Sequence, residues 1–347
     1  MDDNKKQYER LRLGAGLTDY SKYQVFELSG AGATTELNRV SLGDVTRLPI
    51  GRVLATYMLN EDGTLLADVL LWNQGGRFMI LAETKQAESL APFIAKHAPG
   101  AMLKDLAPEI CLLGIDGPFA WEVLKELVGV RILGLRYLET MSDQKIGDIS
   151  TDIIRAGKTG EYGYILKCRA EDGAALAARL LEAGKPFEVA HCNSDVLDLC
   201  KLENRFTNVF KEGAAAKNVL ELNCRVQVSS EKGDYVGREA VENCMEQGVS
   251  HRLIGLTIAS GKVPAEGSTV SYKGEDIGKL VSAGFSWTLD SAIGLALLSH
   301  EYSFVGCDYD VAGEKAKTVS APFVLNKSIQ IRPQEDSFKS VDWSFKP

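Results

Sequence analysis

The clearest hydrophobic pattern in the chain is a pair of strand-like runs on either side of residue 60. Residues 51–59 and 64–72 are mostly apolar, and the sequence Asn-Glu-Asp-Gly at 60–63 separates them. Asp-Gly between two apolar runs is typical of the turn of a β-hairpin. We therefore predict that the two runs pair as antiparallel strands.

The second run contains an acidic residue among apolar ones. Asp68 lies within Leu65–Leu71, which is apolar enough to be buried on both faces. An ionised carboxylate in such a place is strongly disfavoured unless it is ion-paired or hydrogen-bonded. The position therefore indicates a functional acid. The alternatives are a structural ion pair with an arginine and an exposed strand end.

The length of the hairpin turn decides which side chain faces this acid. A two-residue turn at Asp62–Gly63 places Tyr57 opposite Asp68, and a four-residue turn places Ala55 there. Strand side chains alternate with period two, so Tyr57 shares a face with Asp68 in both registers. Tyr57 is therefore a candidate to orient a ligand together with Asp68, and a core aromatic is the alternative.

Other segments repeat apolar residues at the spacing of an α-helix. Four helices are predicted: Gln86–Ala98, Pro118 to a stop at Gly129, an Asp172 cap to Gly184, and one that starts at a Ser194 cap. One face of the last helix carries Val196, Leu199, Cys200, Glu203 and Phe206. Glu203 therefore points inward, toward either a ligand or a structural partner.

The pattern changes at about His251. Short strands then alternate with turns, and we predict no helix between Leu253 and Val319. This is typical of a small all-β barrel or sandwich. Together with a strand-rich stretch at 149–168, the helices and the barrel indicate an α+β fold class. A chain of 347 residues suits two or three domains better than one core.

Composition and charge exclude several classes of protein. The formal net charge is −8 without a basic stripe, so we expect no nucleic-acid partner. No apolar run is long enough to span a bilayer, and the charged N-terminal sequence has no signal-peptide core. We expect a soluble, cytoplasmic protein without a membrane partner. Only the two ends of the chain have the composition of disordered segments.

The cysteines indicate neither disulfides nor a metal. The chain has 7 cysteines, an odd number, and no pair has CxxC spacing. Without an export signal, we expect them to be reduced core residues. The four histidines are scattered, so no metal site is expected.

Two further stretches contain candidate ligand-binding residues. Glycine recurs at every third position within Arg155–Tyr164, so this loop can bring its backbone close to a ligand. The loop precedes a strand and lacks the helix N-terminus of a phosphate loop, and a simple turn is the alternative. Trp287 lies in a Ser/Gly-rich loop, where it either lines a site or plugs the barrel.

Several of these segments, in this order, resemble the motifs of the aminomethyltransferase family, which includes the T-protein of the glycine cleavage system. They are Gly16–Ser21 for G-L-x-D-x-S, Asn60–Asp68 for N-E-x-G-x-[IL]-[IL]-D-D, Gly117–Pro118 for G-P, Gly157–Gly163 for G-Y-T-G-E-x-G, Asp198–Glu203 for D-V-x-R-L-E, Tyr235–Ala240 for F-[VI]-G-[RK]-E-A, and His251–Val270 with Gly278–Leu298 for the C-terminal barrel. The match covers nearly the whole chain, and its order and spacing make it specific.

The resemblance implies a three-domain ring around a central hole that holds tetrahydrofolate. Two of the domains would be ferredoxin-like α+β units, and the third would be the β-barrel. On this basis we assign residues 1–25 and 125–247 to the first α+β domain, residues 26–124 to the second, and residues 248–347 to the barrel.

The resemblance also implies an activity. Family members transfer a one-carbon unit to tetrahydrofolate from an aminomethyl group on a lipoyl carrier protein or from a methylated small molecule. The family's acid at the reactive edge of the folate maps onto Asp68, which would stabilise positive charge on the one-carbon unit. Tyr57 would position Asp68, and Lys158 would contact an anionic group of the cofactor or substrate. The cofactor-binding candidates are Tyr57, Lys158, Glu161, Glu203 and Trp287.

The chain departs from the family at five positions that line the pterin site. These positions hold Ala55, Ala82, Lys158, Ile165 and Leu197. Polar groups of a pterin that are buried without partners cost about 1–3 kcal/mol each, so we expect weak binding of tetrahydrofolate. The alternative function is therefore a non-catalytic or altered-ligand binding protein of the same fold.

Overall fold

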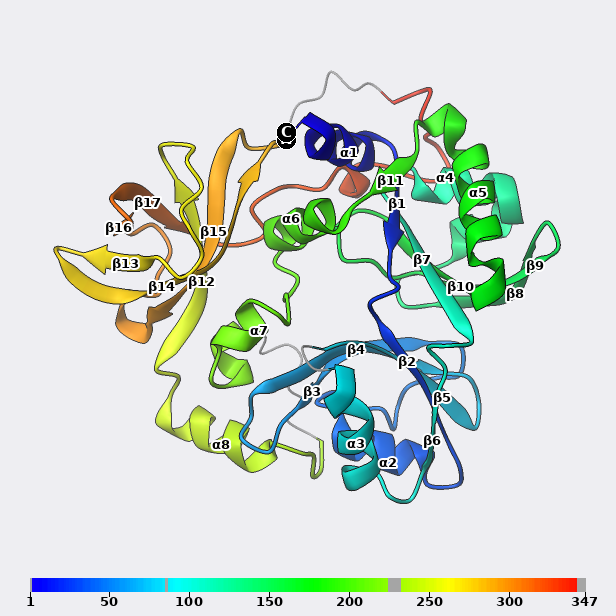
Figure 1. Cartoon of the computed structure of the whole chain (residues 1–347), viewed down its shortest axis with the longest axis horizontal. Helices are drawn as coiled ribbons and strands as arrows, with labels where there is room; N and C mark the ends of the chain where they lie inside the picture. The colour runs from blue at the N-terminus through cyan, green and yellow to red at the C-terminus, as the bar shows by residue number, and fades with distance from the viewer. Residues whose placement is uncertain (1, 85–86, 224–231, 342–347) are drawn as a thin grey trace.

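The computed structural model describes residues 2–84, 87–223 and 232–341, and it divides into three lobes (Figure 1). A five-stranded sheet with two helices forms the lower lobe in that view, and a six-stranded sheet with two helices forms the right-hand lobe. A closed β-barrel forms the left-hand lobe. The predicted α+β class and three-domain arrangement are confirmed.

The five-stranded sheet has the order β3-β4-β5-β2-β6. Its strands are β2 (Gln24–Ser29), β3 (Val53–Leu59), β4 (Leu65–Asn73), β5 (Arg77–Thr84) and β6 (Met102–Asp105). Helices α2 (Ala33–Val40) and α3 (Ala87–His97) cover one face (Figure 1). Leu37 of α2 and Ile94 of α3 are fully buried in the same core cluster as Leu71 and Ile80 of the sheet. Helix α3 lies where the helical pattern predicts it.

The six-stranded sheet has the order β11-β1-β7-β10-β9-β8. Its strands are β1 (Gly16–Asp19), β7 (Ile110–Asp116), β8 (Thr140–Ile146), β9 (Ile149–Ile154), β10 (Gly163–Arg169) and β11 (Ala190–Cys192). Helices α4 (Ala120–Val128) and α5 (Gly173–Gly184) pack on it through Val123, Leu124, Leu176 and Leu180.

The strand pairing bears on where the two α+β units divide. Strand β7 falls inside the 26–124 segment, but it pairs with β1 and β10 of the six-stranded sheet. Strand β2, which begins at Gln24, belongs to the other sheet. We therefore propose that the second unit ends in the connection between β6 and β7 rather than at residue 124.

The C-terminal lobe is a closed barrel with the order β12-β15-β14-β13-β16-β17. Its strands are β12 (His251–Ile258), β13 (Thr269–Tyr272), β14 (Glu275–Ser286), β15 (Ser291–Ser299), β16 (Asp308–Val311) and β17 (Glu314–Val319). Between Leu253 and Val319, all of which the structure describes, the only helical segment is the single 3₁₀ turn His300–Tyr302. The predicted all-β barrel is therefore confirmed.

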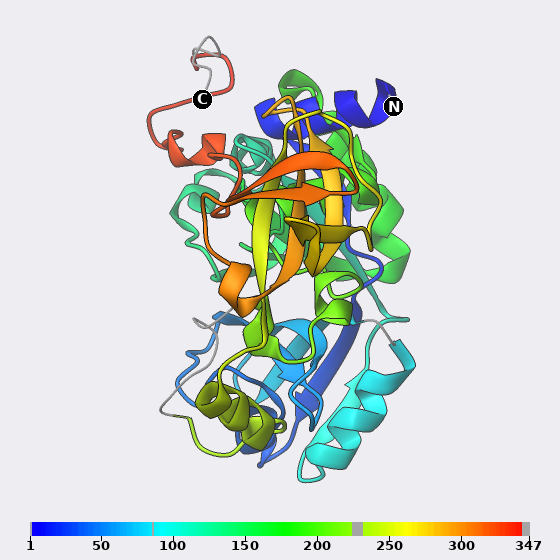
Figure 2. The same cartoon turned by 90° about the vertical axis from the view of Figure 1, so that its left-hand side faces the viewer.

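Four more helices lie between the lobes: α1 (Asp2–Leu13), α6 (Ser194–Asn204), α7 (Glu212–Ala215) and α8 (Arg238–Gln247). The remaining 3₁₀ turns are Val130–Gly134, Ala170–Asp172, Lys185–Phe187, Val219–Leu222 and Lys327–Ile329. Viewed from the barrel side, α1 and the C-terminal segment lie at one end of the molecule, and α8 lies at the other (Figure 2).

The N-terminal segment corrects one expectation from the composition. Residues 2–13, expected to resemble a disordered end, form helix α1. The inner side of this helix buries Tyr8, Leu11 and Arg12. A charged helix with a narrow buried stripe has no strong hydrophobic periodicity, so the sequence pattern did not show it.

Helix ends differ from the prediction in three places. The cap of α6 is Asn193, whose side chain accepts a hydrogen bond from Val196 N at 3.1 Å, and Ser194 is the first helical residue. Asp172 occupies the cap position of α5 but makes no capping hydrogen bond. Its carboxylate accepts from Arg169 Nε at 3.0 Å. Helix α4 begins at Ala120, after Pro118, and Gly129 caps it as predicted.

Two global features follow from the described residues. Among them, no helix is long and apolar enough to cross a membrane. The six described cysteines are free, and Cys168, Cys192 and Cys200 are buried as predicted. Cys111, Cys244 and Cys307 are only partly buried, and Cys224 lies outside the described residues.

Candidate active site

The predicted hairpin fixes Asp68 in the middle of a buried strand. Strands β3 and β4 pair with Tyr57 opposite Asp68, and β5 pairs with the other edge of β4. Asp68 is only 5% exposed. The turn is longer than the two-residue form, since Asn60 N donates to Thr64 O, and an extra residue at Leu66 restores the register.

A buried ammonium contacts the Asp68 carboxylate. Lys158, in the glycine-rich loop between β9 and β10, places its Nζ 2.5 Å from Asp68 Oδ2. The ring centroid of Phe206 lies 5.9 Å from the same nitrogen. Burial raises the pKa of Asp68, and the Lys158 ammonium opposes this shift. In this structure Lys158 pairs with Asp68, and its contact with an anionic group of a ligand stays a prediction.

A second buried ion pair lies beside the first. Glu83 of β5 is the cross-strand neighbour of Asp68. The Nζ of Lys201, on α6, lies 2.7 Å from Glu83 Oε1, and both side chains are at most 10% exposed. Sequence reasoning missed this pair. Lys201 stands beside the apolar stripe of its helix, and its partner Glu83 lies 118 residues away in the sequence, so no local pattern indicates the contact.

Tyr57 has the predicted position. Its ring is buried in the core cluster that also holds Tyr8 of α1 and Val196 of α6, and its hydroxyl lies 2.7 Å from Thr207 Oγ1. Thr207 follows Phe206 directly after α6. Tyr57 therefore links strand β3 to the segment after α6, where the Phe206 ring lies near Lys158.

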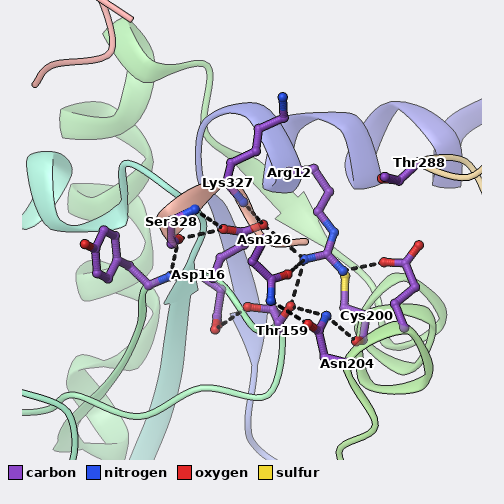
Figure 3. Close-up of polar contacts among 12 residues, drawn as sticks. Arg12, Asp116, Thr159, Cys200, Asn204, Thr288, Asn326, Lys327 and Ser328 are labelled. Atoms are coloured by element: carbon purple, nitrogen blue, oxygen red, sulfur yellow. Dashed lines mark hydrogen bonds and ion pairs between the residues drawn. The ribbon is translucent and has the colours of Figure 1, made fainter. Parts of the chain in front are cut away.

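Arg12 joins the two other acids predicted to support the site (Figure 3). Its guanidinium donates to Glu203 through Nη2, and its Nη1 lies 3.3 Å from Glu161 Oε1. The same Nη1 donates to the carbonyl of Thr159 at 2.8 Å and to Asn326 Oδ1 at 3.2 Å. One side chain of α1 thus ties together α6, the glycine-rich loop and the C-terminal segment.

The remaining partners of these two acids are also protein groups. Glu203 accepts hydrogen bonds from Tyr8 at 2.6 Å and from Ser286 of the barrel at 2.5 Å. Glu161 accepts from the backbone and hydroxyl of Ser328 at 2.8 and 2.6 Å. In this structure the two carboxylates hold the lobes together, which is the structural alternative for Glu203, and their contact with a ligand stays a prediction.

Asp116 explains the glycine pattern of the loop. It is fully buried at the end of β7 and accepts hydrogen bonds from Thr18 at 2.8 Å and from Thr159 at 3.1 Å. A Cβ on Gly157 or Gly163 would come within 2.6 Å of its Oδ1. The glycines thus let the loop close over a buried carboxyl. Sequence reasoning did not find Asp116. It is the last residue of strand β7, and the sequence of that strand does not indicate which loop packs on its end.

Asp116 makes stability depend on pH. Burial raises its pKa to about 7 from 3.8, so the folded protein binds this proton more tightly than the unfolded chain does. The protonated Asp116 therefore stabilises the folded protein at low pH. This contribution to the free energy of unfolding, on the order of 4 kcal/mol, is lost as pH rises through 7. We expect Asp116→Asn to flatten the fall in the free energy of unfolding between pH 4 and 7.

Urea unfolding of both proteins at several pH values measures this effect. Asp152→Asn, which breaks a 2.7 Å pair with Lys167, is the control and should leave the slope in place. An unchanged slope in Asp116→Asn would show that this carboxyl titrates normally.

An open pocket of about 280 Å³ lies between α6, α7 and the barrel. Its walls include three half-buried aromatic rings, Phe206, Phe285 and Trp287. Three carboxylates also line it, Asp195, Asp198 and Glu212, and burial raises the pKa of Asp198 and Glu212. Trp287 thus faces a pocket and also packs against Tyr8, with the ring centroids 5.1 Å apart and the planes tilted by 58°. Because Phe206 lies beside Lys158, this pocket adjoins the two ion pairs.

The positions that depart from the family lie in apolar surroundings. Ala82, Ile165 and Leu197 are buried, and Ala55 packs against the same core cluster as Ile165. Ala82 belongs to the core cluster under α2 and α3, and the fifth position, Lys158, pairs with Asp68. Within the described residues, no group of three or more His, Cys, Asp or Glu side chains could hold a metal ion.

Comparisons with known proteins agree with this architecture. The family model for the GCVT N-terminal domain matches residues 2–232, and that for the glycine cleavage T-protein C-terminal barrel domain matches residues 251–325. The aminomethyltransferase of Symbiobacterium thermophilum is 31% identical, with 92% of this chain and 88% of the relative covered. That of Bacillus subtilis is 28% identical, with 92% and 90% covered.

The fold has a counterpart among solved structures. The glycine cleavage system aminomethyltransferase T from Bartonella henselae matches with a TM-score of 0.83 at 24% identity, and the match covers 92% of this chain and 89% of that one. The predicted resemblance and the predicted transferase class are confirmed, and these relatives give no support to the non-catalytic alternative. With both domain models matched in order along its length, the chain belongs to the glycine cleavage T-protein family of aminomethyltransferases.

Proposed function

We propose that this protein transfers a one-carbon unit to tetrahydrofolate or a related carrier, with Asp68 beside the reacting carbon. The observation that carries the proposal is the placement of Asp68. It is a buried carboxylate in the centre of an apolar strand, at the position of the family's reactive-edge acid, and it adjoins an aromatic pocket through Lys158 and Phe206.

The surroundings of Asp68 suit the stabilisation of developing positive charge. Strand pairing on both sides fixes the carboxylate, so little reorganisation is needed when charge develops near it. Burial alone would favour the neutral acid, and the Lys158 ammonium opposes this by favouring the carboxylate. Lys158 is therefore a positioning residue that helps to keep Asp68 charged.

The pocket residues fit a reduced pterin carrier. Flat aromatic walls at Phe206 and Trp287 suit its rings. The carboxylates of Asp198 and Glu212 can accept hydrogen bonds from the N–H donors of an aminopyrimidine edge. When bound, such a carrier supplies the nitrogen that takes up the one-carbon unit. The apolar residues at 165 and 197 still predict weaker binding than in relatives with polar groups there.

The donor belongs to one of two classes. The family resemblance suggests either an aminomethyl group on a lipoyl carrier protein or a methylated small molecule. We place the reaction in the cytoplasm, without nucleic acid or membrane as partners, in keeping with the acidic composition.

A label-transfer assay tests the proposal. The purified protein is incubated anaerobically with tetrahydrofolate and a donor of either class that carries ¹³C on the transferable carbon. Mass spectrometry is expected to find the label on the carrier, in amounts that exceed the enzyme. Omission of the protein is the control. Absence of enzyme-dependent label with both donor classes, for a folded protein, would refute the proposal.

A further inference from the structure

The two buried ion pairs carry no net charge between them, although Lys201 also lies 3.7 Å from Asp198 Oδ1 at the pocket. Asp68 and Glu83 are cross-strand neighbours, and each is paired with one lysine at 2.5 and 2.7 Å. The four side chains are each at most 10% exposed. A ligand that enters between Asp68 and Lys158 therefore meets opposite charges that already neutralise one another.

The charge balance restricts what can bind. A purely cationic ligand at Asp68 would displace Lys158 and leave its ammonium buried without a counterion. A purely anionic ligand at Lys158 would leave the Asp68 carboxylate buried without a counterion. Removing one partner of a buried ion pair is strongly unfavourable because the other ion is left uncompensated. A ligand that carries both charges leaves neither ion unpaired.

We propose that this site takes, beside the carrier, a small zwitterion whose cationic nitrogen faces Asp68 and whose carboxylate faces Lys158. The inference rests on the proposed function in that it names the substrate class of the same site. It concerns binding, so it can be tested without turnover.

The two partners of the Asp68–Lys158 pair differ in how far they can move. Asp68 sits on a central strand between two ladders. The Lys158 ammonium stands on a four-carbon stem from a loop, and its neighbour Phe206 lines the open pocket. A zwitterion can therefore insert by displacing the lysine head toward the pocket while the carboxylate stays in place.

Polar atoms without partners lie next to the pair. Glu83 Oε2 and the Tyr23 hydroxyl are buried and have no hydrogen-bond partner among the described residues. Burial raises the pKa of the Tyr23 hydroxyl, and the charges of Glu83 and Asp68 raise it further. Buried polar groups in native proteins are normally satisfied. Here the Glu83 oxygen can accept from an ammonium, and the Tyr23 hydroxyl can donate to a carboxylate.

Calorimetric titration with molecules of matched size tests the inference. Glycine and β-alanine are the zwitterions, isobutylamine is the cation that lacks a carboxylate, and propionate is the anion that lacks an amine. We expect at least one zwitterion to bind the wild-type protein about 100-fold or more tighter than either singly charged molecule, as loss of a buried counterion implies.

Variants of the lysine separate charge pairing from general fit. Lys158→Met should reverse the preference, so that isobutylamine binds better than either zwitterion, and Lys158→Arg should keep the zwitterion preference. Lys167→Met is the matched control, because Lys167 forms a 2.7 Å pair with Asp152 between strands β9 and β10, and it should bind as the wild type does.

The possible outcomes are distinct. Equal binding of cation and zwitterion, no binding of any probe, or an unchanged preference in Lys158→Met would overturn this inference. If the label-transfer assay fails while the zwitterion preference holds, the proposed function fails and the charge selectivity stands. If transfer occurs without a zwitterion preference, only the present inference fails.

Discussion

Replacing Asp68 by Asn is expected to lower the rate of one-carbon transfer by roughly 10²-fold or more while the protein stays folded. The substitution keeps the size of the side chain and removes the negative charge that opposes positive charge on the reacting carbon. Removal of one preorganised electrostatic group has an effect of this size in other enzymes. The rate of label transfer per folded molecule is the measurement, with the folded fraction taken from circular dichroism.

Asp152→Asn provides the control for this experiment. It breaks an Asp–Lys pair of similar length, 2.7 Å, on strands β9 and β10, and it should transfer label at the wild-type rate. If Asp68→Asn lost stability but kept full activity per folded molecule, Asp68 would be a structural ion-pair partner and not a catalytic residue.

The second large effect is expected at Arg12. Replacing it with Met leaves Glu203 and Glu161, whose side chains are 0% and 1% exposed, without their shared cation. Breaking a buried ion pair from one side costs about 3–5 kcal/mol, so Arg12→Met should lower the free energy of unfolding by that amount in urea titrations. The loss should appear at the contacts of α1 with α6 and the C-terminal segment.

Arg77→Met is the matched control for Arg12. Arg77 pairs with Glu27 at 3.1 Å, but its side chain is 55% exposed. Exposed pairs contribute about 1 kcal/mol or less, so this variant should unfold almost as the wild type does. A loss of less than about 1 kcal/mol in Arg12→Met would mean that the two glutamates find other partners or become protonated.

Local signals in the sequence were enough for much of the fold. The β3–β4 hairpin follows from an Asp-Gly turn between apolar runs, and its register follows from the two-residue period of a strand. The barrel follows from short strands with turns and no helical period. Strand β8 carries mostly polar side chains at the edge of its sheet, so it has no hydrophobic pattern to find.

The candidate site was only partly predictable, because its contacts join residues that are distant in sequence. Asp68 could be found from its own run, since a charged residue among apolar ones is conspicuous. Its partner Lys158 is 90 residues away. Glu203 was correctly expected to point inward, but its partner Arg12 lies in a charged helix that gives no sign of burial. The local sequence around a buried acid does not distinguish a contact with a ligand from a contact between domains.

A crystal structure of the protein soaked with saturating tetrahydrofolate would test the central claim most directly, namely that the reacting centre is Asp68 with its adjoining pocket. We predict density for the carrier between Phe206 and Trp287, with its one-carbon-accepting edge turned toward Asp68. Density that lies away from these residues, or an empty pocket beside a carrier bound elsewhere, would contradict the account.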